Sequence, residues 1–133
     1  MSEPAVDDPE VLAEVEAVFA LYEQALMQND VATLDALFWQ SPHTVRYGVG
    51  ENLYGSEAIF AFRRARPGGS PPRTVLRRAV SSFGRDFATT CIEFRRTATH
   101  GDAGVGRQTQ CWVRFEDGWR IVTAHVSLMA DFS

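Results

Sequence analysis

Among the side chains of this sequence that could carry chemistry are the Tyr22 phenol and the Arg46 guanidinium. A tyrosine with a pKa near 10 is protonated at neutral pH, so it suits the role of a proton donor. An arginine offers a planar fork of N–H donors that matches a carboxylate.

Each of the two also has a purely structural interpretation. Tyr22 lies in an apolar stripe of helical spacing, so its ring points inward and its hydroxyl needs a partner, which could simply be part of the core. Arg46 shares one face of a short strand with Thr44 and Gly48. A cation there is unfavourable when buried unpaired, and either an internal carboxylate such as Glu93 or a substrate anion would meet it.

A polar row in the closing segment, residues 106–129, is a second candidate surface. Asp117-Gly118 suits a two-residue hairpin turn, and pairing outward from it places Glu116 opposite Trp119. In this register one face carries polar residues, and the other carries apolar ones. The polar face consists of Gln108, Gln110 and Trp112 opposite Ser127, His125 and Thr123. We expect this row to orient a substrate, with an oligomer interface as the alternative.

Further side chains are candidates for substrate binding. The amides of Gln108 and Gln110 each offer a carbonyl acceptor and N–H donors to a polar ligand. His125 could be a base, a wall residue or a structural contact, and its spacing to the other histidines fits no metal motif, so we expect no metal. The remaining wall candidates, for which core packing is also plausible, are Trp39, Tyr54, Phe60 and Trp112, with Arg73 and Glu93 as weaker candidates on the sheet.

Helices are predicted in the first half of the chain. Asp8 and Pro9 suit the N-cap and first position of a helix that runs to about Gln28. Asp30 caps a short second helix to about Phe38, and Ser56 caps a third to about Arg66. We expect residues 1–8 to form a disordered tail and residues 9–133 a single domain.

Strands are predicted from residue 74 onward, at 74–83, 87–98, 105–116 and 119–129, with turns at 84–86 and 100–104. A short strand is expected at 43–48, followed by a glycine-containing loop at 49–55. Helices followed by an antiparallel meander indicate an α+β fold, in which three N-terminal helices lie over the concave face of a curved sheet. The mouth of such a cone is a natural small-molecule site.

Composition excludes several classes of protein. The net charge of −4 argues against nucleic acid as a partner. No apolar run approaches 18 residues and the N-terminus lacks a signal-peptide pattern, so we expect a cytoplasmic protein without a membrane partner. All 13 basic residues are arginine. The basic zone at 63–78 is interpreted mainly as a solvated helix end and strand face.

The order of elements and the closing GWRIVTAHVS resemble the nuclear transport factor 2-like, or SnoaL-like, superfamily. Three segments narrow the resemblance to its AtzH/HpxZ-like branch, and they resemble the AtzH type most. They are RYGVGENLYGSEAIFAFRRAR, FGRDFATTCIEFRR and GRQTQCWVRFEDGWRIVTAHVSLM. The resemblance implies a cone-shaped pocket, a homodimer or homotetramer, no cofactor, and a catalytic pair formed by a tyrosine of the first helix and an arginine of the first strand. Tyr22 and Arg46 occupy those elements.

The resemblance also implies a reaction: decarboxylation of 1,3-dicarboxyurea to allophanate in cyanuric acid catabolism. One alternative is a non-catalytic protein that binds a small carboxylate, or an accessory protein in the catabolism of oxalurate and other ureido acids. Another is proton transfer of the ketosteroid isomerase kind. That chemistry requires a carboxylate base in the pocket, and Glu93 is the candidate.

Overall fold

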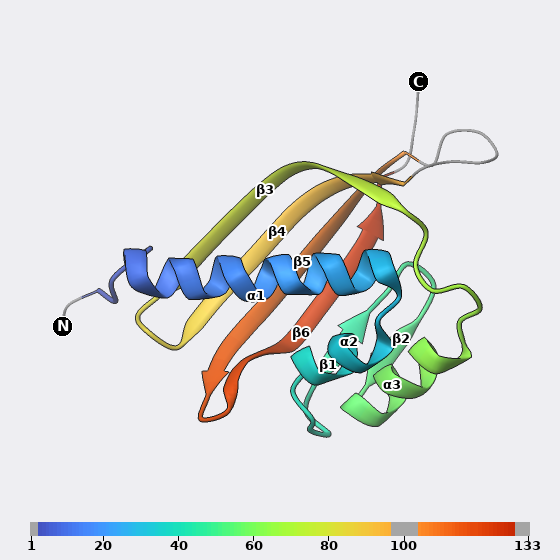
Figure 1. Ribbon diagram of the computed structural model, residues 1–133, viewed down its shortest axis with the longest axis horizontal. Coiled ribbons are helices and arrows are strands. Elements are labelled where there is room, and N and C mark those ends of the chain that lie inside the picture. Colours follow the sequence, from blue (N-terminus) through green and yellow to red (C-terminus); the bar gives the residue numbers. More distant parts are fainter. Residues whose placement is uncertain (1–2, 97–103, 130–133) are drawn as a thin grey trace.

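Three helices lie against one face of a curved six-stranded sheet in the computed structural model, which describes residues 3–96 and 104–129 (Figure 1). The helices are α1 (Pro9–Gln28), α2 (Val31–Leu37) and α3 (Ser56–Ala65). The strands are β1 (Val45–Tyr47), β2 (Asn52–Tyr54), β3 (Arg73–Phe83), β4 (Phe87–Arg96), β5 (Val105–Phe115) and β6 (Gly118–Leu128). The α+β cone predicted from the sequence is confirmed.

The sheet order is β2-β1-β6-β5-β4-β3. All neighbouring strands are antiparallel except β1 and β6, which run parallel. The short strand β1 therefore lies beside the end of the long meander, and Arg46 pairs with Ala124 of β6. The turn expected at 100–104 lies outside the described residues except for Gly104.

Helix α1 begins as its sequence predicts. The Asp8 carboxylate accepts hydrogen bonds from the backbone N–H groups of Glu10 and Val11, and Pro9 occupies the first turn. One stripe of the helix packs on the sheet and is buried. It consists of Val11, Val15, Phe19, Tyr22 and Ala25. Because this stripe places Tyr22 on the sheet side of α1, the helix fixes where its side chain enters the fold.

The structure differs from the expectation at three local points. In the segment expected as a disordered tail, Asp7 is hydrogen-bonded to Ser82 through both backbone and side chain. Gly55, not Ser56, is the N-cap of α3, because the Ser56 hydroxyl accepts a hydrogen bond from the Ser41 backbone instead. The loop expected at 49–55 contains the strand β2.

The predicted register of the closing hairpin is wrong. Phe115 pairs with Gly118, so the turn residues are Glu116 and Asp117, one position earlier than Asp117-Gly118. A β-bulge then leaves Val122 as an extra residue, since Trp112 pairs with Ile121 and Cys111 with Thr123. A slip of one residue exchanges the two faces of a strand, so the predicted polar row does not exist as one surface.

The row instead divides between the two faces of the sheet. The buried face, toward the helices, carries Gln108, Gln110 and Trp112 together with Ile121, Ala124 and Val126. The opposite face carries Thr123, His125 and Ser127 together with Arg107, Thr109 and Cys111. Of the predicted row, Gln108, Gln110 and Trp112 therefore face the helices, and Thr123, His125 and Ser127 do not.

Candidate active site

Four arginines from four elements gather at one end of the helix-covered face, and we call them the arginine cluster: Arg46, Arg66, Arg73 and Arg96. They come from β1, the C-cap of α3, the first residue of β3 and the last residue of β4, and the β-ladder pairs Arg73 with Arg96. Their positions at strand and helix ends bring together residues that are far apart in sequence.

Two phenylalanine rings support the cluster. The guanidinium carbons of Arg46 and Arg66 lie 5.8 and 5.3 Å from the centre of the Phe62 ring. Those of Arg73 and Arg96 lie 4.6 and 5.8 Å from the centre of the Phe94 ring. Cation–π attraction holds a guanidinium by its face, so its N–H groups at the edge stay available for hydrogen bonds.

Two carboxylates partly neutralise the cluster. Arg46 Nη1 donates to Glu51 Oε1 at 3.1 Å, and Arg73 Nη2 donates to Glu23 Oε1 at 2.5 Å. Glu93, the carboxylate suggested for Arg46 from the sequence, is exposed on the opposite face of the sheet, where it pairs with Arg77 and Arg107 in the ladder. Four guanidinium groups and two carboxylates leave the set with two more positive charges than negative ones.

The charges of the cluster act on one another. Burial, followed by the positive charge of Arg46, lowers the pKa of Arg66. Arg96 also lowers this pKa, whereas Glu51 and Tyr22 raise it. Burial, followed by the positive charge of Arg73, lowers the pKa of Arg96. Arg66 thus interacts electrostatically with both Arg46 and Tyr22. Depressed arginine pKa values indicate a site that favours an added anion.

The buried face of β5 offers hydrogen-bond donors without acceptors. Gln108 Oε1 accepts from Arg73 Nη1 at 3.1 Å, and Gln110 Oε1 accepts from the Thr90 hydroxyl at 3.0 Å. Both partners need an oxygen acceptor, because arginine only donates and the Thr90 oxygen already accepts the Trp112 indole N–H. The Nε2 groups of both glutamines and Arg73 Nε are buried and have no partner among the described residues.

Other predicted wall residues lie elsewhere. His125 is on the opposite face of the sheet, where its ring packs in a T-shaped arrangement with the Tyr47 ring, with centroids 5.7 Å apart. The Tyr54 side chain is exposed, and its hydrogen bond with the Tyr47 hydroxyl raises the pKa of Tyr54. Trp112 is fully buried, and its indole N–H is satisfied by Thr90. None of these three side chains contacts the arginine cluster in the described part of the chain.

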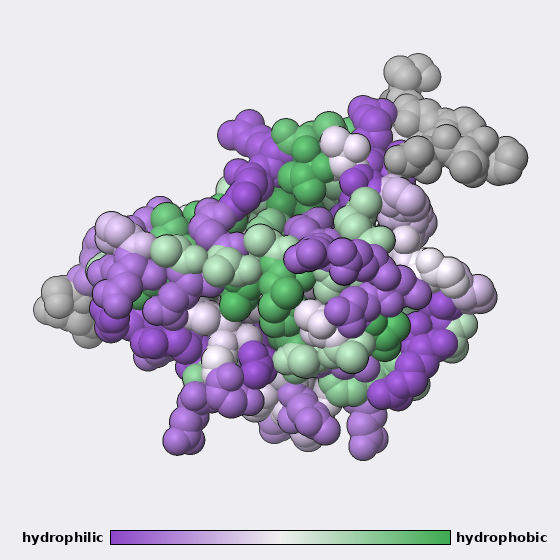
Figure 2. Space-filling model, viewed as in Figure 1, coloured by the Kyte–Doolittle hydropathy of each residue, from purple (hydrophilic) through white to green (hydrophobic). Residues whose placement is uncertain are grey.

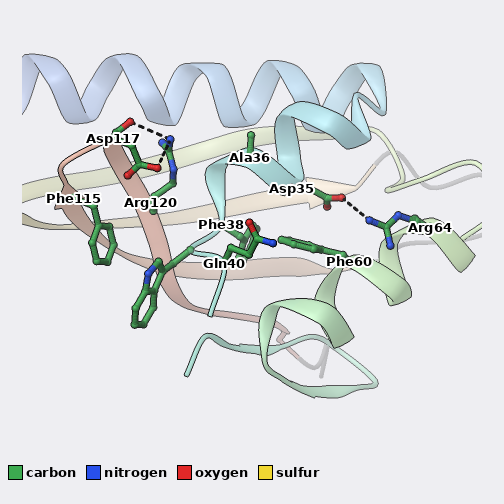
Figure 3. A pocket seen from close by; sticks show the side chains of 10 residues that line it. Asp35, Ala36, Phe38, Gln40, Phe60, Arg64, Phe115, Asp117 and Arg120 are labelled. Atoms are coloured by element: carbon green, nitrogen blue, oxygen red, sulfur yellow. Dashed lines mark hydrogen bonds and ion pairs between the residues drawn. The ribbon is translucent and has the colours of Figure 1, made fainter. Parts of the chain in front are cut away.

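Trp39 and Phe60 line a separate groove of about 620 Å³ between α2, α3 and the hairpin turn (Figure 3). The Trp39 ring stacks on Phe115 with centroids 5.2 Å apart. Arg64 and Arg120 border the groove and are paired with Asp35 and Asp117. The groove includes neither Tyr22 nor Arg46, and its charges are matched, so it is distinct from the site at the arginine cluster.

Arg66, Arg96, Glu23 and Glu51 complete the site and were missed as candidates from the sequence. Arg66 lies in the basic zone that was interpreted as mainly solvated. Arg96 and Glu51 lie at a strand end and in a loop, where periodicity does not specify which way a side chain points. The useful signal was the close spacing of arginines at 63–78 and 95–96 in a chain without lysine.

Comparisons with known proteins agree with this architecture. Residues 4–132 match the AtzH-like family. The chain belongs to the AtzH-like family. The predicted AtzH-like resemblance is thereby confirmed, and the chain shares the fold of nuclear transport factor 2-like proteins. No curated protein matches the sequence.

Solved structures extend the comparison. A protein of unknown function of the DUF3225 family from Pectobacterium atrosepticum is 52% identical, with a TM-score of 0.88, and the match covers 94% of this chain and 95% of that one. A cystatin-like fold protein from Burkholderia xenovorans is 46% identical, with a TM-score of 0.90 and coverages of 96% and 98%. A nuclear transport factor 2-like protein from Salmonella enterica, 21% identical over 93% of this chain and 94% of that one at a TM-score of 0.72, shares the fold.

The described helices include none that is both long and apolar enough to cross a membrane.

Hydrophilic residues dominate the rim of the face seen in Figure 1, and hydrophobic residues gather toward its centre (Figure 2).

Proposed function

We propose that this AtzH-like protein is a cofactor-independent decarboxylase that converts 1,3-dicarboxyurea to allophanate and carbon dioxide. One relationship supports this reaction above all: the Tyr22 phenol and the Arg46 guanidinium both neighbour Arg66 in a site with excess positive charge. A proton donor and an anion-binding group are the two components that this chemistry requires. The family match supports a reaction of this kind.

In the proposed mechanism, Arg46 binds a substrate carboxylate and so fixes the neighbouring nitrogen near Tyr22. The bond between that nitrogen and a carboxylate carbon breaks, its electron pair stays on nitrogen, and Tyr22 supplies the proton. Carbon dioxide leaves, and the phenolate regains a proton from solvent. One dianion and one proton thereby give one monoanion and carbon dioxide, with no change of oxidation state.

The buried amides have a part in the same scheme. A ureido carbonyl is an acceptor without charge, which suits the unpartnered Nε2 groups of Gln108 and Gln110. A buried donor without an acceptor is unfavourable, and a bound substrate would relieve that cost. We therefore assign substrate binding to the two glutamines. His125 and Tyr54 lie on the opposite face of the sheet, Trp39 lines the separate groove, and Trp112 is fully buried with its N–H bonded to Thr90.

The proton donor can be tested by Tyr22→Phe, which keeps the buried ring and removes the hydroxyl. Positioned acid catalysis contributes about 10²–10⁴-fold, so we expect kcat for 1,3-dicarboxyurea to fall by that order, with a smaller change in KM. Carbon dioxide release above the spontaneous rate is the measurement. Phe19→Leu, on the same buried stripe, is the control for packing. Full activity of Tyr22→Phe would exclude the donor role.

The main alternative is a protein that binds a small carboxylate without turnover, for which the same arginine cluster would suffice. It predicts thermal stabilisation by the ligand and no release of carbon dioxide above the spontaneous rate. The isomerase-type alternative is less favoured, because its candidate base Glu93 lies on the opposite face of the sheet. The two carboxylates of the site, Glu23 and Glu51, are ion-paired with Arg73 and Arg46.

A further inference from the structure

We propose that the arginine cluster is a clamp for two carboxylates, in which Arg46 and Arg66 bind one and Arg73 and Arg96 bind the other. The two halves have the same composition: two guanidinium groups on one phenylalanine ring, with one internal glutamate. Each half therefore has one unbalanced positive charge. The identity of the substrate rests on the proposed function, whereas the clamp itself is a statement about binding.

Each half contains an arginine that its internal glutamate leaves unpaired. Glu51 lies against Arg46 and Glu23 against Arg73, while Arg66 and Arg96 form no ion pair with another described residue. A partly buried guanidinium without a counter-ion is unfavourable, and two such groups in one site favour a ligand with two negative charges. In both halves, the group that needs a counter-ion is thus the arginine without an internal ion pair.

The second half also has an orphaned donor. The Arg73 side chain is 5% exposed, and its Nε has no hydrogen-bond partner among the described residues, although both of its Nη groups are engaged. Beside it, Gln108 Nε2 is likewise buried and unpartnered. Arg73 Nε needs an oxygen acceptor, which a second carboxylate would supply, while Gln108 Nε2 donates to the ureido carbonyl.

The clamp defines the class of substrate. A ureido dicarboxylate fills both halves, whereas a ureido monocarboxylate such as oxalurate or allophanate leaves one half with its charge unbalanced. Loss of carbon dioxide removes one of the two carboxylates, so the product can bind only one half of the clamp. The same residues that select the dianion would therefore favour release of the monoanionic product.

Glutarate is a suitable probe, because it has the five-atom chain of 1,3-dicarboxyurea between and including its carboxyl carbons and does not decarboxylate. Monomethyl glutarate is the matched ligand with one carboxylate blocked. We expect Arg96→Gln to weaken glutarate binding by about 10–100-fold, the effect of losing a hydrogen bond to a charged group, as measured by calorimetry. Binding of the monoester should fall by about twofold at most, since it can still use the half with Arg46 and Arg66.

Arg77→Gln is the control, because it removes the same charge from an exposed residue on the opposite face of the same sheet. Arg66→Gln tests the half formed by Arg46 and Arg66, and it replaces Arg96→Gln as the test variant if Arg96→Gln does not fold. The clamp is refuted if glutarate and its monoester bind equally well, or if both lose affinity equally in Arg96→Gln. Glutarate selectivity without turnover of 1,3-dicarboxyurea would instead retain the clamp and reject the proposed decarboxylase.

Discussion

At the scale of single residues, one glycine shapes the candidate site through the side chain that it lacks. A Cβ atom added at Gly48 would lie 1.7 Å from Glu51 Oε1. The Glu51 carboxylate therefore lies over the Gly48 backbone, where it reaches the guanidinium of Arg46 on the same face of β1. Glu51 is thus an internal competitor for the group that we propose binds the substrate.

Gly48→Ala should displace this competitor. The backbone tolerates alanine, since Gly48 is not among the positions of positive φ, and only the end of a flexible side chain must move. Even an exposed ion pair contributes about 0.2–1 kcal/mol, and the Arg46–Glu51 pair is largely buried, so we expect glutarate affinity to rise by about fivefold. Glu51→Gln should act similarly, and the two changes together should give no more than either alone.

Gly50→Ala provides the matched control, because a Cβ atom there meets nothing within 4 Å. It should leave glutarate affinity unchanged. If the effects of Gly48→Ala and Glu51→Gln instead add, the glycine does not act through the glutamate.

The sequence predicted part of the residue-scale picture. Tyr22 and Arg46 were identified with the help of the family resemblance, and Gln108, Gln110 and Arg73 were candidates that the structure places with the cluster or on the same buried face. Arg66 and Arg96 were not predicted, because the role of each depends on a partner from a distant element. Such partners follow from topology, and spacing along the chain does not reveal them.

At the scale of elements, α1 was predicted accurately because its signals are local. The Asp8 cap, Pro9 and the apolar stripe all lie within the helix or beside it. The same helix positions Tyr22 in the buried stripe and Glu23 beside Arg73. The correct prediction of α1 was therefore enough to locate Tyr22, one member of the proposed catalytic pair.

Asp8→Ala should destabilise the fold without changing the site. Loss of the cap costs about 0.5–2 kcal/mol, and Tyr22 lies about four turns further along α1. We expect the free energy of unfolding in urea to fall by that amount, while glutarate affinity stays the same. Glu10→Ala removes the same charge from the first turn without removing the cap. Equal destabilisation by both variants would assign the effect to charge, and the capping bonds would then be unimportant.

The hairpin was predicted less well, for a physical reason. Glu116, Asp117 and Gly118 allow turns at neighbouring positions, and both strands carry polar and apolar residues on each face, so the pattern does not fix the register. The bulge at Val122 leaves no sequence signature of its own. Strand β2 was missed because it is three residues long and partly exposed, which gives too little periodicity for detection.

At the scale of the whole molecule, the net charge of the protein is negative, whereas the charge of the candidate site is positive. The chain has a net charge of −4, while the arginine cluster with its two glutamates is positive. The remaining surface therefore repels the anions that the site attracts, and attraction becomes effective only near the cluster. The expected homo-oligomer and the cytoplasmic location stay predictions.

Salt should weaken binding of the dianion. The Debye length shortens from about 10 Å at 0.1 M salt to about 3 Å at 1 M, and the side chains of Arg46 and Arg73 are only partly screened because both are largely buried. We expect the Kd of glutarate to rise by several-fold between 0.1 and 1 M sodium chloride, and that of its monoester to rise less. A salt-independent Kd for glutarate would show that charge does not drive binding.

The bulge in β6 sets which residues of that strand face the helices. Before it, Trp119 and Ile121 face inward, and after it Ala124 and Val126 do. Because Val122 is the extra residue, its deletion would leave Trp112 opposite Ile121 and Cys111 opposite Thr123, and the same side chains would face the helices. A deletion of one residue further along β6, with the bulge kept, would instead exchange the two faces of the strand beyond it. The position of a deletion relative to the bulge therefore decides whether the lining of the cone is kept or replaced.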